Sequence, residues 1–354
     1  MQLFITGICG FVGSRVALHL LKQTPGLTIV GIDNLARAGA HTNLPILRAA
    51  GVKIIHGDVR AVSDLETVAK MDWIIDAAAL PSVLAGVDGK SSSRQLVEHN
   101  LLGTINLLEL AKRHNAGVVL LSTSRVYSVE GLSRIPVVAR DRRFVFDDGA
   151  AAPAGCSAAG ISESFSTAAP LSLYGATKLA SEVMALEYAH AFGLPVIINR
   201  CGVMAGAGQF GTAEQGIFSY WIAAYASKQP LRYIGFDGTG RQVRDALHPH
   251  DLAELIVKQI GANVRTGTWN AGGGNDASMS LAELTDWCAA RFGAHEVQTD
   301  LRPRRYDAPW IVMDSAAVRR DFKWQPRISL ESILSQIAQH HSAHPDWLDL
   351  ATPY

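Results

Sequence analysis

The sequence predicts an α/β fold: a doubly wound parallel sheet followed by a smaller C-terminal α/β region. Short apolar or β-branched runs alternate with amphipathic stretches up to Arg200, as strands and helices do in successive βα units. A glycine cluster follows the first run and opens the first amphipathic stretch. Beyond Arg200 the alternation stops, and glycine-rich turns separate shorter segments.

Six runs are predicted to be strands, and three longer segments between them are predicted to be helices. The strands are Leu3–Thr6, Thr28–Ile32, Lys53–His56, Trp73–Asp76, Gly117–Ser122 and Val196–Arg200. The helices are Phe11–Leu21, His99–Arg113 and Tyr174–Phe192. This order is typical of a sheet whose helices cover both faces.

The same pattern predicts how the chain divides into domains. Residues 1–200 are expected to form a nucleotide-binding domain, to which residues 246–262 return. Residues 201–245 and 263–354 are expected to form the substrate-binding region. The segment from Val129 to Pro170 is rich in Ala, Gly, Ser and Pro, and we expect it to be a long excursion over the site and a candidate lid.

Composition excludes several classes of protein. Apolar residues make up 48% of the chain, and 32 basic residues balance 32 acidic ones, which argues against disorder and against a nucleic-acid partner. No apolar stretch approaches the roughly 20 residues of a membrane span, and no basic segment precedes the first strand. We therefore expect a cytoplasmic protein with no membrane segment.

The four cysteines give no sign of a metal site. They are scattered without a CxxC pair or a histidine at ligand spacing, so we expect free thiols and no bound metal. They are Cys9, Cys156, Cys201 and Cys288.

The glycine cluster indicates a dinucleotide site on a Rossmann-type sheet. A side chain at Gly7 or Gly10 would obstruct the tight turn that brings a pyrophosphate to the positive end of a helix. Gly13 allows close packing of helix on strand. Asp33 stands 20 residues after Gly13, where a carboxylate accepts hydrogen bonds from the adenosine ribose and repels a 2′-phosphate. NAD is therefore the predicted cofactor, in preference to NADP.

Two later strand ends support this prediction. Asp58 and Val59 follow the third predicted strand and are placed to meet the adenine. Three small residues, Ala77, Ala78 and Ala79, follow the fourth and leave room for the cofactor.

Tyr174 and Lys178 are candidate catalytic residues because they lie four apart on one helix face. A nearby ammonium can lower the pKa of a phenol, which is otherwise a poor base at neutral pH. A tyrosine and a lysine at this spacing also occur on solvated helix faces, so the pair alone is weak evidence. Ser122, Thr123 and Ser124 add three hydroxyls at the carboxyl edge of the sheet, where open α/β sheets bind ligands.

Together with Asp33-Asn34-Leu35 and Arg244-Asp245, these features resemble the extended short-chain dehydrogenase/reductase family of NDP-sugar epimerases and dehydratases, over nearly the whole chain. The resemblance implies a catalytic triad of Thr123, Tyr174 and Lys178, with Ser124 as the alternative hydroxyl. The cofactor contacts predicted by motif and resemblance together are Gly7, Gly10, Phe11, Val12, Gly13, Asp33, Asn34, Asp58, Val59, Ala77, Ala78, Ala79, Asn100, Tyr174 and Lys178, with Asn100 matching the helix asparagine that supports the lysine.

The resemblance also implies substrate contacts. Arg244 and Arg304 fall on the family's diphosphate-binding positions, although surface arginines are an alternative for both. Val203 stands where many members carry a substrate-binding asparagine, and Gln209 or Gln215 can substitute for it. The complete predicted substrate set is Ser124, Arg125, Gln209, Gln215, Arg244 and Arg304.

The chemistry that the resemblance implies is a transient oxidation of a nucleotide-linked sugar. Tyr174 as phenolate takes a hydroxyl proton while NAD accepts a hydride, and return of the hydride to the opposite face inverts the carbon. Four segments, Asp33–Arg37, Asn199–Gly211, Glu214–Gly216 and Tyr233–His248, are most similar to members that epimerise a CDP-sugar at carbon 2.

The same motifs are compatible with functions other than 2-epimerisation. A 4-epimerase or another sugar enzyme of the same family fits the same motifs, and so does a non-catalytic NAD-binding sensor, although a sensor would not need the triad. Many dehydratases of the family carry Asp-Glu after the active-site hydroxyl, where this chain has Ser124-Arg125. The resemblance further suggests a homodimer built through the helices of Asn100 and Tyr174.

Overall fold

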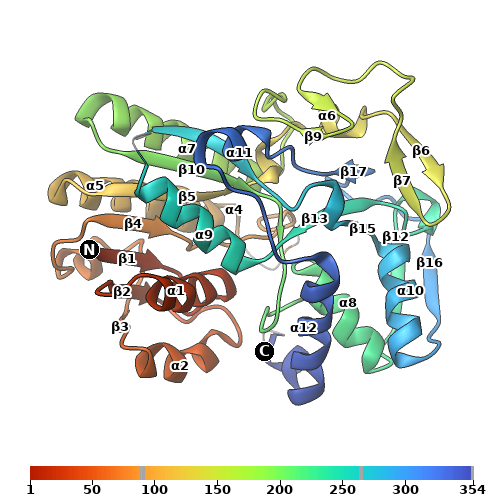
Figure 1. Cartoon of the computed structure of the whole chain (residues 1–354), viewed down its shortest axis with the longest axis horizontal. Coiled ribbons are helices and arrows are strands. Elements are labelled where there is room, and N and C mark those ends of the chain that lie inside the picture. Colours follow the sequence, from red (N-terminus) through yellow and green to blue (C-terminus); the bar gives the residue numbers. More distant parts are fainter. Residues whose placement is uncertain (88, 90–91, 263–265, 352–354) are drawn as a thin grey trace.

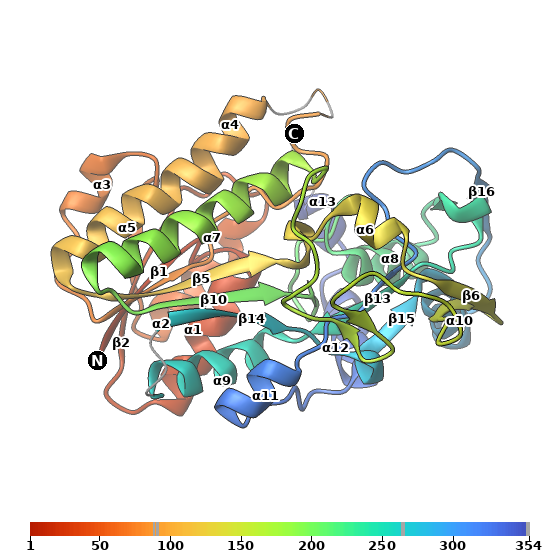
Figure 2. The same ribbon diagram turned by 90° about the horizontal axis from the view of Figure 1, so that it is seen from above.

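The computed structural model describes residues 1–87, 89, 92–262 and 266–351. Its central element is a seven-stranded sheet in the order β14-β10-β5-β4-β1-β2-β3, in which all neighbours are parallel (Figures 1 and 2). The strands are β1 (Gln2–Thr6), β2 (Thr28–Asp33), β3 (Lys53–His56), β4 (Trp73–Asp76), β5 (Gly117–Thr123), β10 (Val196–Cys201) and β14 (Thr266–Ala271). The order reverses between β1 and β4, which confirms the predicted doubly wound sheet.

All six predicted strands are present. The seventh, β14, belongs to this sheet although its residues were predicted to lie in the substrate-binding region, so that part of the domain prediction was wrong. Its sequence, TGTWNA, has no apolar run, and only its last three residues are buried. An edge strand needs less apolar surface than a central one, so hydrophobic patterning did not reveal it.

Helices cover both faces of the sheet (Figure 2). One face carries α1 (Phe11–Gln23), α9 (Pro249–Ile260) and α11 (Ala316–Phe322), and the other carries α3 (Val62–Glu66), α5 (Gly103–His114) and α7 (Leu173–Phe192). Each face has its own apolar core, formed around Ile5 and Leu252 on the first and around Phe4 and Leu108 on the second. Alternate residues of a strand point to opposite faces, which explains why Phe4 and Ile5 belong to different cores.

Two shorter helices and a π-helical turn complete this part. They are α2 (Leu44–Ala49), α4 (Ser93–Val97) and η2 (Glu98–Leu102). The predicted helix His99–Arg113 is thus divided into η2 and α5. Such π-turns are frequent at functional sites.

The remainder of the chain lies beside the carboxyl edge of the sheet (Figure 1). A small mixed sheet contains β11 (Val203–Met204), β13 (Val243–Leu247), β15 (Ser278–Ser280) and β17 (Trp310–Ile311), and β12 (Leu231–Ile234) pairs with β16 (Val297–Asp300). Three helices pack into a separate apolar core, α8 (Ile217–Ala226), α10 (Leu281–Phe292) and α12 (Leu330–Ala343), and α13 (Trp347–Ala351) follows them. No helix in the described part of the chain has the length and hydropathy to span a bilayer.

The Val129–Pro170 segment is ordered and does not cover the site. It forms α6 (Val129–Ser133), the hairpin of β6 (Val137–Arg140) and β7 (Arg143–Phe146), and the short pair β8 (Cys156–Ser157) and β9 (Gly160–Ile161). Its buried side chains, such as Leu132 and Phe165, pack against Trp310 and Met313. None of the residues lining the two cavities described below comes from it, so the expectation of an excursion over the site was wrong. Its apolar residues hold it against β17 and the residues on either side of that strand, 308–313, instead.

Candidate active site

A cavity of about 520 Å³ lies at the carboxyl edge of the sheet, next to the glycine turn. It meets the point between β1 and β4 where the strand order reverses, which is the usual ligand position in such sheets. Twelve of the predicted cofactor residues line it: Gly7, Gly10, Phe11, Val12, Gly13, Asp33, Asn34, Val59, Ala77, Ala78, Ala79 and Tyr174.

The glycine turn leaves no room for side chains. A Cβ at Gly13 would lie 2.3 Å from the Gly7 carbonyl oxygen, and one at Gly7, whose φ is +60°, would lie 3.0 Å from the backbone of Ala77 and Ala78. Helix α1 begins directly after Gly10 without a side-chain cap, so its first N–H groups remain available to a ligand. The positive end of a helix therefore faces a cavity of dinucleotide size, and the residues fit NAD.

Asp33 connects the end of β2 to the glycine turn. Its carboxylate accepts hydrogen bonds from the backbone N–H groups of Cys9 at 2.9 Å and Leu35 at 2.8 Å. Burial raises the pKa of Asp33, and these N–H donors act against that shift. Each carboxylate oxygen has a further lone pair, so the side chain can still accept from ribose hydroxyls.

Asp58 does not line the cavity, in contrast to the prediction. Its carboxylate accepts two hydrogen bonds from the Arg60 guanidinium, at 2.7 and 2.9 Å, and one from Asn34 at 2.9 Å. The Arg60 guanidinium holds the pKa of Asp58 well below its usual range. Gly57 and Val59, the neighbours of Asp58, reach the cavity instead, because the Arg60 pair turns the carboxylate away.

Asn100 also lies outside the lining, within the π-turn η2. Its side chain accepts a hydrogen bond from the Leu80 N–H at 2.8 Å and donates to the Thr177 hydroxyl at 3.2 Å. It therefore ties the loop after β4 to helix α7, and any effect on the cofactor is through these two elements.

The predicted catalytic residues lie where the end of β5 meets the start of α7. The Ser172 hydroxyl caps α7 by accepting from the Gly175 N–H at 3.0 Å. A Cβ at Gly175 would lie 2.1 Å from the Arg125 carbonyl oxygen, so only glycine allows this close approach. The approach brings the Tyr174 hydroxyl into hydrogen-bond contact with the Thr123 side chain.

Burial, rather than Lys178, dominates the electrostatics of Tyr174. Burial raises the pKa of Tyr174 to about 12, while the Thr123 hydrogen bond and the charge of Arg125 act in the opposite direction. The loss of phenolate hydration on burial therefore outweighs the lowering of this pKa that a nearby ammonium can produce. Lys178 is 1% exposed and lies outside the cavity lining; burial lowers its pKa, and Asp76 and Glu182 act against that shift.

Two buried acidic groups near Lys178 were not expected from the sequence. Asp76 accepts hydrogen bonds from Thr6 at 2.9 Å and Thr104 at 2.8 Å. Glu182 pairs with Arg200 at 2.7 Å and accepts from the Ser122 hydroxyl. Single acidic residues within a strand or a helix carry no motif, so only packing identifies them.

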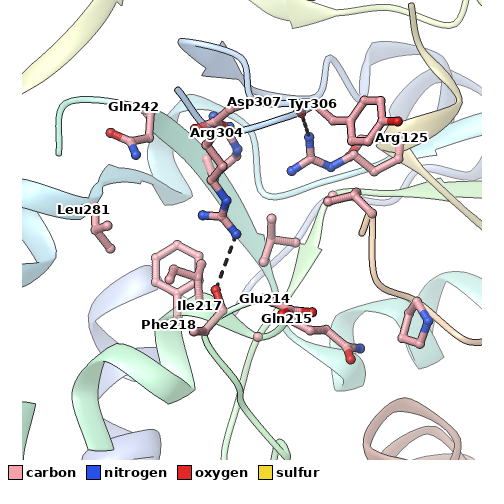
Figure 3. A pocket seen from close by; sticks show the side chains of 18 of the residues that line it. Arg125, Glu214, Gln215, Ile217, Phe218, Gln242, Leu281, Arg304, Tyr306 and Asp307 are labelled. Atoms are coloured by element: carbon pink, nitrogen blue, oxygen red, sulfur yellow. Dashed lines mark hydrogen bonds and ion pairs between the residues drawn. The ribbon is translucent and has the colours of Figure 1, made fainter. Parts of the chain in front are cut away.

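A second cavity, of about 190 Å³, adjoins the first and is rich in arginine (Figure 3). Arg125 donates to the Tyr306 carbonyl at 3.1 Å, Arg304 donates to the Ala213 carbonyl at 3.4 Å, and Arg244 pairs with Asp307 at 2.5 Å. Burial lowers the pKa of Arg125 to about 10, with further lowering from Arg244 and Arg304. Three mutually repelling cations around one cavity are suited to an anionic ligand.

The other predicted substrate residues differ in their surroundings. Ser124 lines the second cavity, and Gln215 lines both cavities. Gln209 lines only the first, and its amide is occupied: it donates to the Met204 carbonyl at 2.8 Å and accepts from Ser219 at 2.9 Å. Gln209 therefore holds the 204–219 loop together, and its predicted substrate contact is not supported.

The C-terminal helix α13 contributes to the cofactor cavity, which the sequence did not indicate. Ala351 is one of the lining residues. Trp347 stacks on Phe210 at 5.0 Å between ring centroids, and its indole donates to the Gln209 carbonyl at 2.9 Å. No local spacing connects residues so far apart in the chain.

No metal centre is visible in the described ranges, where no group of three or more His, Cys, Asp or Glu side chains is arranged to hold an ion. The four cysteines are free thiols. His248 caps helix α9 by accepting from the His250 N–H at 3.2 Å.

Comparison with known proteins identifies the family. Residues 3–272 match the model of the NAD dependent epimerase/dehydratase family. The chain is 30% identical to CDP-paratose 2-epimerase of Salmonella typhi, over 93% of this chain and 96% of that protein, and 26% identical to UDP-glucose 4-epimerase of Halalkalibacterium halodurans, over 98% and 97%. Its fold is similar to that of UDP-glucuronic acid 4-epimerase from Bacillus cereus in complex with UDP-glucuronic acid and NAD, with a TM-score of 0.76, 22% identity and coverage of 97% and 99%.

The family model covers most of the chain and includes the glycine turn, Thr123, Tyr174 and Lys178. The chain belongs to the NAD-dependent epimerase/dehydratase family, and it is an enzyme of the epimerase type with NAD as its cofactor.

Proposed function

We propose that this enzyme epimerises a CDP-linked sugar through a transient keto intermediate, in the manner of CDP-paratose 2-epimerase. The observation that carries the proposal is that Thr123 and Tyr174 line both cavities. A sugar bound at that junction has the cofactor site on one side and the three arginines on the other.

The arginine-rich cavity suits the diphosphate of a nucleotide sugar. Arg125, Arg244 and Arg304 offer guanidinium groups that can bind phosphate oxygens with two parallel hydrogen bonds. Arg244 is paired with Asp307, so the diphosphate competes with that carboxylate or joins it on the same guanidinium.

Tyr174 is the proposed acid/base. NAD, held by the residues of the first cavity, supplies reversible hydride acceptance, which allows a sugar carbinol to be oxidised and then reduced with no net consumption of cofactor. Tyr174 as phenolate takes the hydroxyl proton, and the Thr123 hydroxyl orients the same sugar oxygen. Lys178 adds positive charge that favours the phenolate.

Inversion requires the keto sugar to turn its opposite face toward the cofactor cavity, so that the carbonyl carbon would be reduced from that side while Tyr174 returns the proton to the sugar oxygen. A rigid set of contacts to the whole substrate would prevent that turn. Anchoring through the diphosphate leaves the sugar ring free to rotate about the bonds to its phosphate. The cofactor cavity is therefore where the sugar is oxidised and reduced, and the arginines of the second cavity keep the keto sugar bound in between.

The alternatives within the family differ in which carbon reacts. Arg125 occupies the position where dehydratases of the family carry an acidic residue, and its guanidinium is bonded to the Tyr306 carbonyl. This arrangement disfavours dehydration, which needs an acid/base pair there. A 4-epimerase remains the second candidate, because 4-epimerases align over almost the whole chain.

We further propose a homodimer through the helical face that carries α4 and α7. Val97, Leu102 and Val183 are 43%, 40% and 53% exposed there, and the elements that carry them contact one another. Burying this apolar surface against a second copy would remove it from water. The enzyme is also proposed to be cytoplasmic.

The test is a screen of CDP-, UDP-, GDP- and dTDP-sugars, with product stereochemistry read by NMR. We expect inversion at carbon 2 of a CDP-sugar. Inversion at carbon 4 would establish the second candidate, and no turnover with any nucleotide sugar would contradict the proposal.

A further inference from the structure

Two residues that line the substrate cavity, Gln242 and Asp307, each have one buried polar atom without a hydrogen-bond partner among the described residues; the other carboxylate oxygen of Asp307 pairs with Arg244, whereas Gln242 has no charged partner. Gln242 lies immediately before β13, lines this cavity and is 8% exposed, and its Oε1 has no hydrogen-bond partner in the described part of the protein. A buried acceptor without a donor is costly, so such atoms usually meet a ligand or water. The position therefore calls for a hydrogen-bond donor from the ligand.

The surroundings of Gln242 are suited to a flat, apolar-faced group. Phe218, Leu281 and Leu284 line the same cavity. Figure 3 shows Gln242 and Leu281 on one side of Arg304 and Arg125 on the other. A nucleotide sugar has its base and its sugar on opposite sides of the diphosphate. With the sugar near Tyr174 and Arg125, the base falls on the Gln242 side.

The orientation of the Gln242 amide follows from its second contact. Nε2 donates to the Ile234 carbonyl at 3.4 Å. Exchanging the amide nitrogen and oxygen would set two carbonyl oxygens against each other and lose that bond. The oxygen therefore faces the cavity as an acceptor.

We infer that Gln242 selects the nucleobase, its amide oxygen accepting a hydrogen bond from the exocyclic amine of cytosine. Uracil and thymine carry a carbonyl oxygen in place of that amine, so two acceptors would meet and both would stay unpaired. This inference rests on the proposed function, because it assumes a nucleotide-sugar substrate. It names Gln242 as the residue that distinguishes cytosine from the other pyrimidines, through the amine that only cytosine carries.

The experiment measures binding of CDP and UDP to the NAD-loaded enzyme by calorimetry. We expect the wild type to bind CDP about tenfold more tightly than UDP, as one hydrogen bond allows. Gln242→Met has similar length without the acceptor, and we expect it to lose about tenfold in CDP affinity, keep its UDP affinity and show no preference. Gln325→Met, at an exposed position outside this cavity, should behave as the wild type.

A second measurement does not depend on the variant folding. The wild type is titrated with a CDP analogue whose base carries hydrogen in place of the amine, and we expect it to bind about tenfold more weakly than CDP. NAD binding by Gln242→Met reports whether that variant is folded.

The outcomes separate this inference from the proposed function. Equal binding of CDP and UDP, full binding of the analogue, or an unchanged preference in a folded Gln242→Met would overturn the role of Gln242 while leaving a nucleotide-sugar enzyme. Binding of neither diphosphate by NAD-loaded enzyme would contradict the proposed function itself, and the inference with it.

Discussion

The two cavities of this enzyme are built in different ways. Small residues that follow neighbouring parallel strands, such as Gly7, Gly10, Ala77 and Ala78, line the centre of the strand-order reversal in the cofactor cavity. The substrate cavity is lined by large side chains from separate stretches, including Arg125, Gln215, Gln242, Leu281 and Arg304. Most of the first cavity lies at one sheet edge, with Phe210 and Ala351 added from other parts of the chain, whereas the second is formed by several loops and helices that converge.

The two cavities depend on different physical properties to bind their ligands. Shape dominates in the cofactor cavity, where an added methyl group at Gly13 would meet the main chain. Charge dominates in the substrate cavity, where Arg244 forms an ion pair with Asp307 and Arg125 keeps its charge while donating to the Tyr306 carbonyl. Substitutions that add volume should therefore damage the first, and substitutions that remove charge should damage the second.

Tyr174→Phe tests the junction of the two cavities. We expect kcat to fall by about 10²–10⁴-fold, because positioned acid/base groups contribute effects of that size, while NAD affinity stays largely intact. Steady-state kinetics with the substrate found in the sugar screen and NAD titration check both parts. Tyr188→Phe lies on the same helix α7 with its hydroxyl bonded to Glu109, and should leave kcat unchanged. Normal turnover by Tyr174→Phe would contradict the mechanism.

Arg244→Met tests the charge of the substrate cavity alone. We expect affinity for a nucleoside diphosphate to fall on the order of 100-fold, as expected for a lost charge-assisted contact, with NAD affinity unchanged. Calorimetry measures both ligands. Arg302→Met removes an arginine whose side chain is 77% exposed and should have no effect. A parallel loss of NAD affinity would show that the two cavities are not independent.

Gly13→Ala tests the shape of the cofactor cavity. The new Cβ would lie 2.3 Å from the Gly7 carbonyl oxygen, and overpacking of this kind costs about 1–3 kcal/mol of stability. We expect a lower Tm and weaker NAD binding, measured by thermal unfolding with and without NAD. Gly261→Ala, where no neighbouring atom lies nearer than 3.4 Å, is the matched control. Unchanged NAD binding would show that the close approach of Gly13 to the Gly7 carbonyl oxygen is not needed to bind the cofactor.

Asp33→Ala tests the one charged group in the cofactor cavity that was predicted to recognise the ribose. We expect NAD to bind about tenfold more weakly and NADP to be less affected, because a carboxylate accepts from ribose hydroxyls and repels a phosphate. Asp33→Asn removes the charge, and its single amide oxygen can keep one of the two hydrogen bonds that the carboxylate accepts from the Cys9 and Leu35 N–H groups on separate oxygens. Equal weakening of both cofactors would show that the ribose assignment is wrong.

Prediction from the sequence succeeded better for the cofactor cavity than for the substrate cavity. The glycine turn, Asp33 and the alanines after β4 could be located in advance because strand, turn and helix signals are contiguous in the sequence. Asp58 marks the limit of that reasoning, since its position at the end of β3 was correct but Arg60 turns its side chain away from the cavity. Gln209 failed for a similar reason, because Met204 and Ser219 already occupy its amide.

The sequence by itself determined the doubly wound sheet, the glycine turn and the one-turn spacing of Tyr174 and Lys178, because periodicity and short spacing act within a few residues. Only the tertiary structure decided that burial raises the pKa of Tyr174, that Arg244 is paired with Asp307, and that α13 reaches the cofactor cavity. Desolvation and ion pairing depend on which distant segments meet, and no local pattern encodes those meetings.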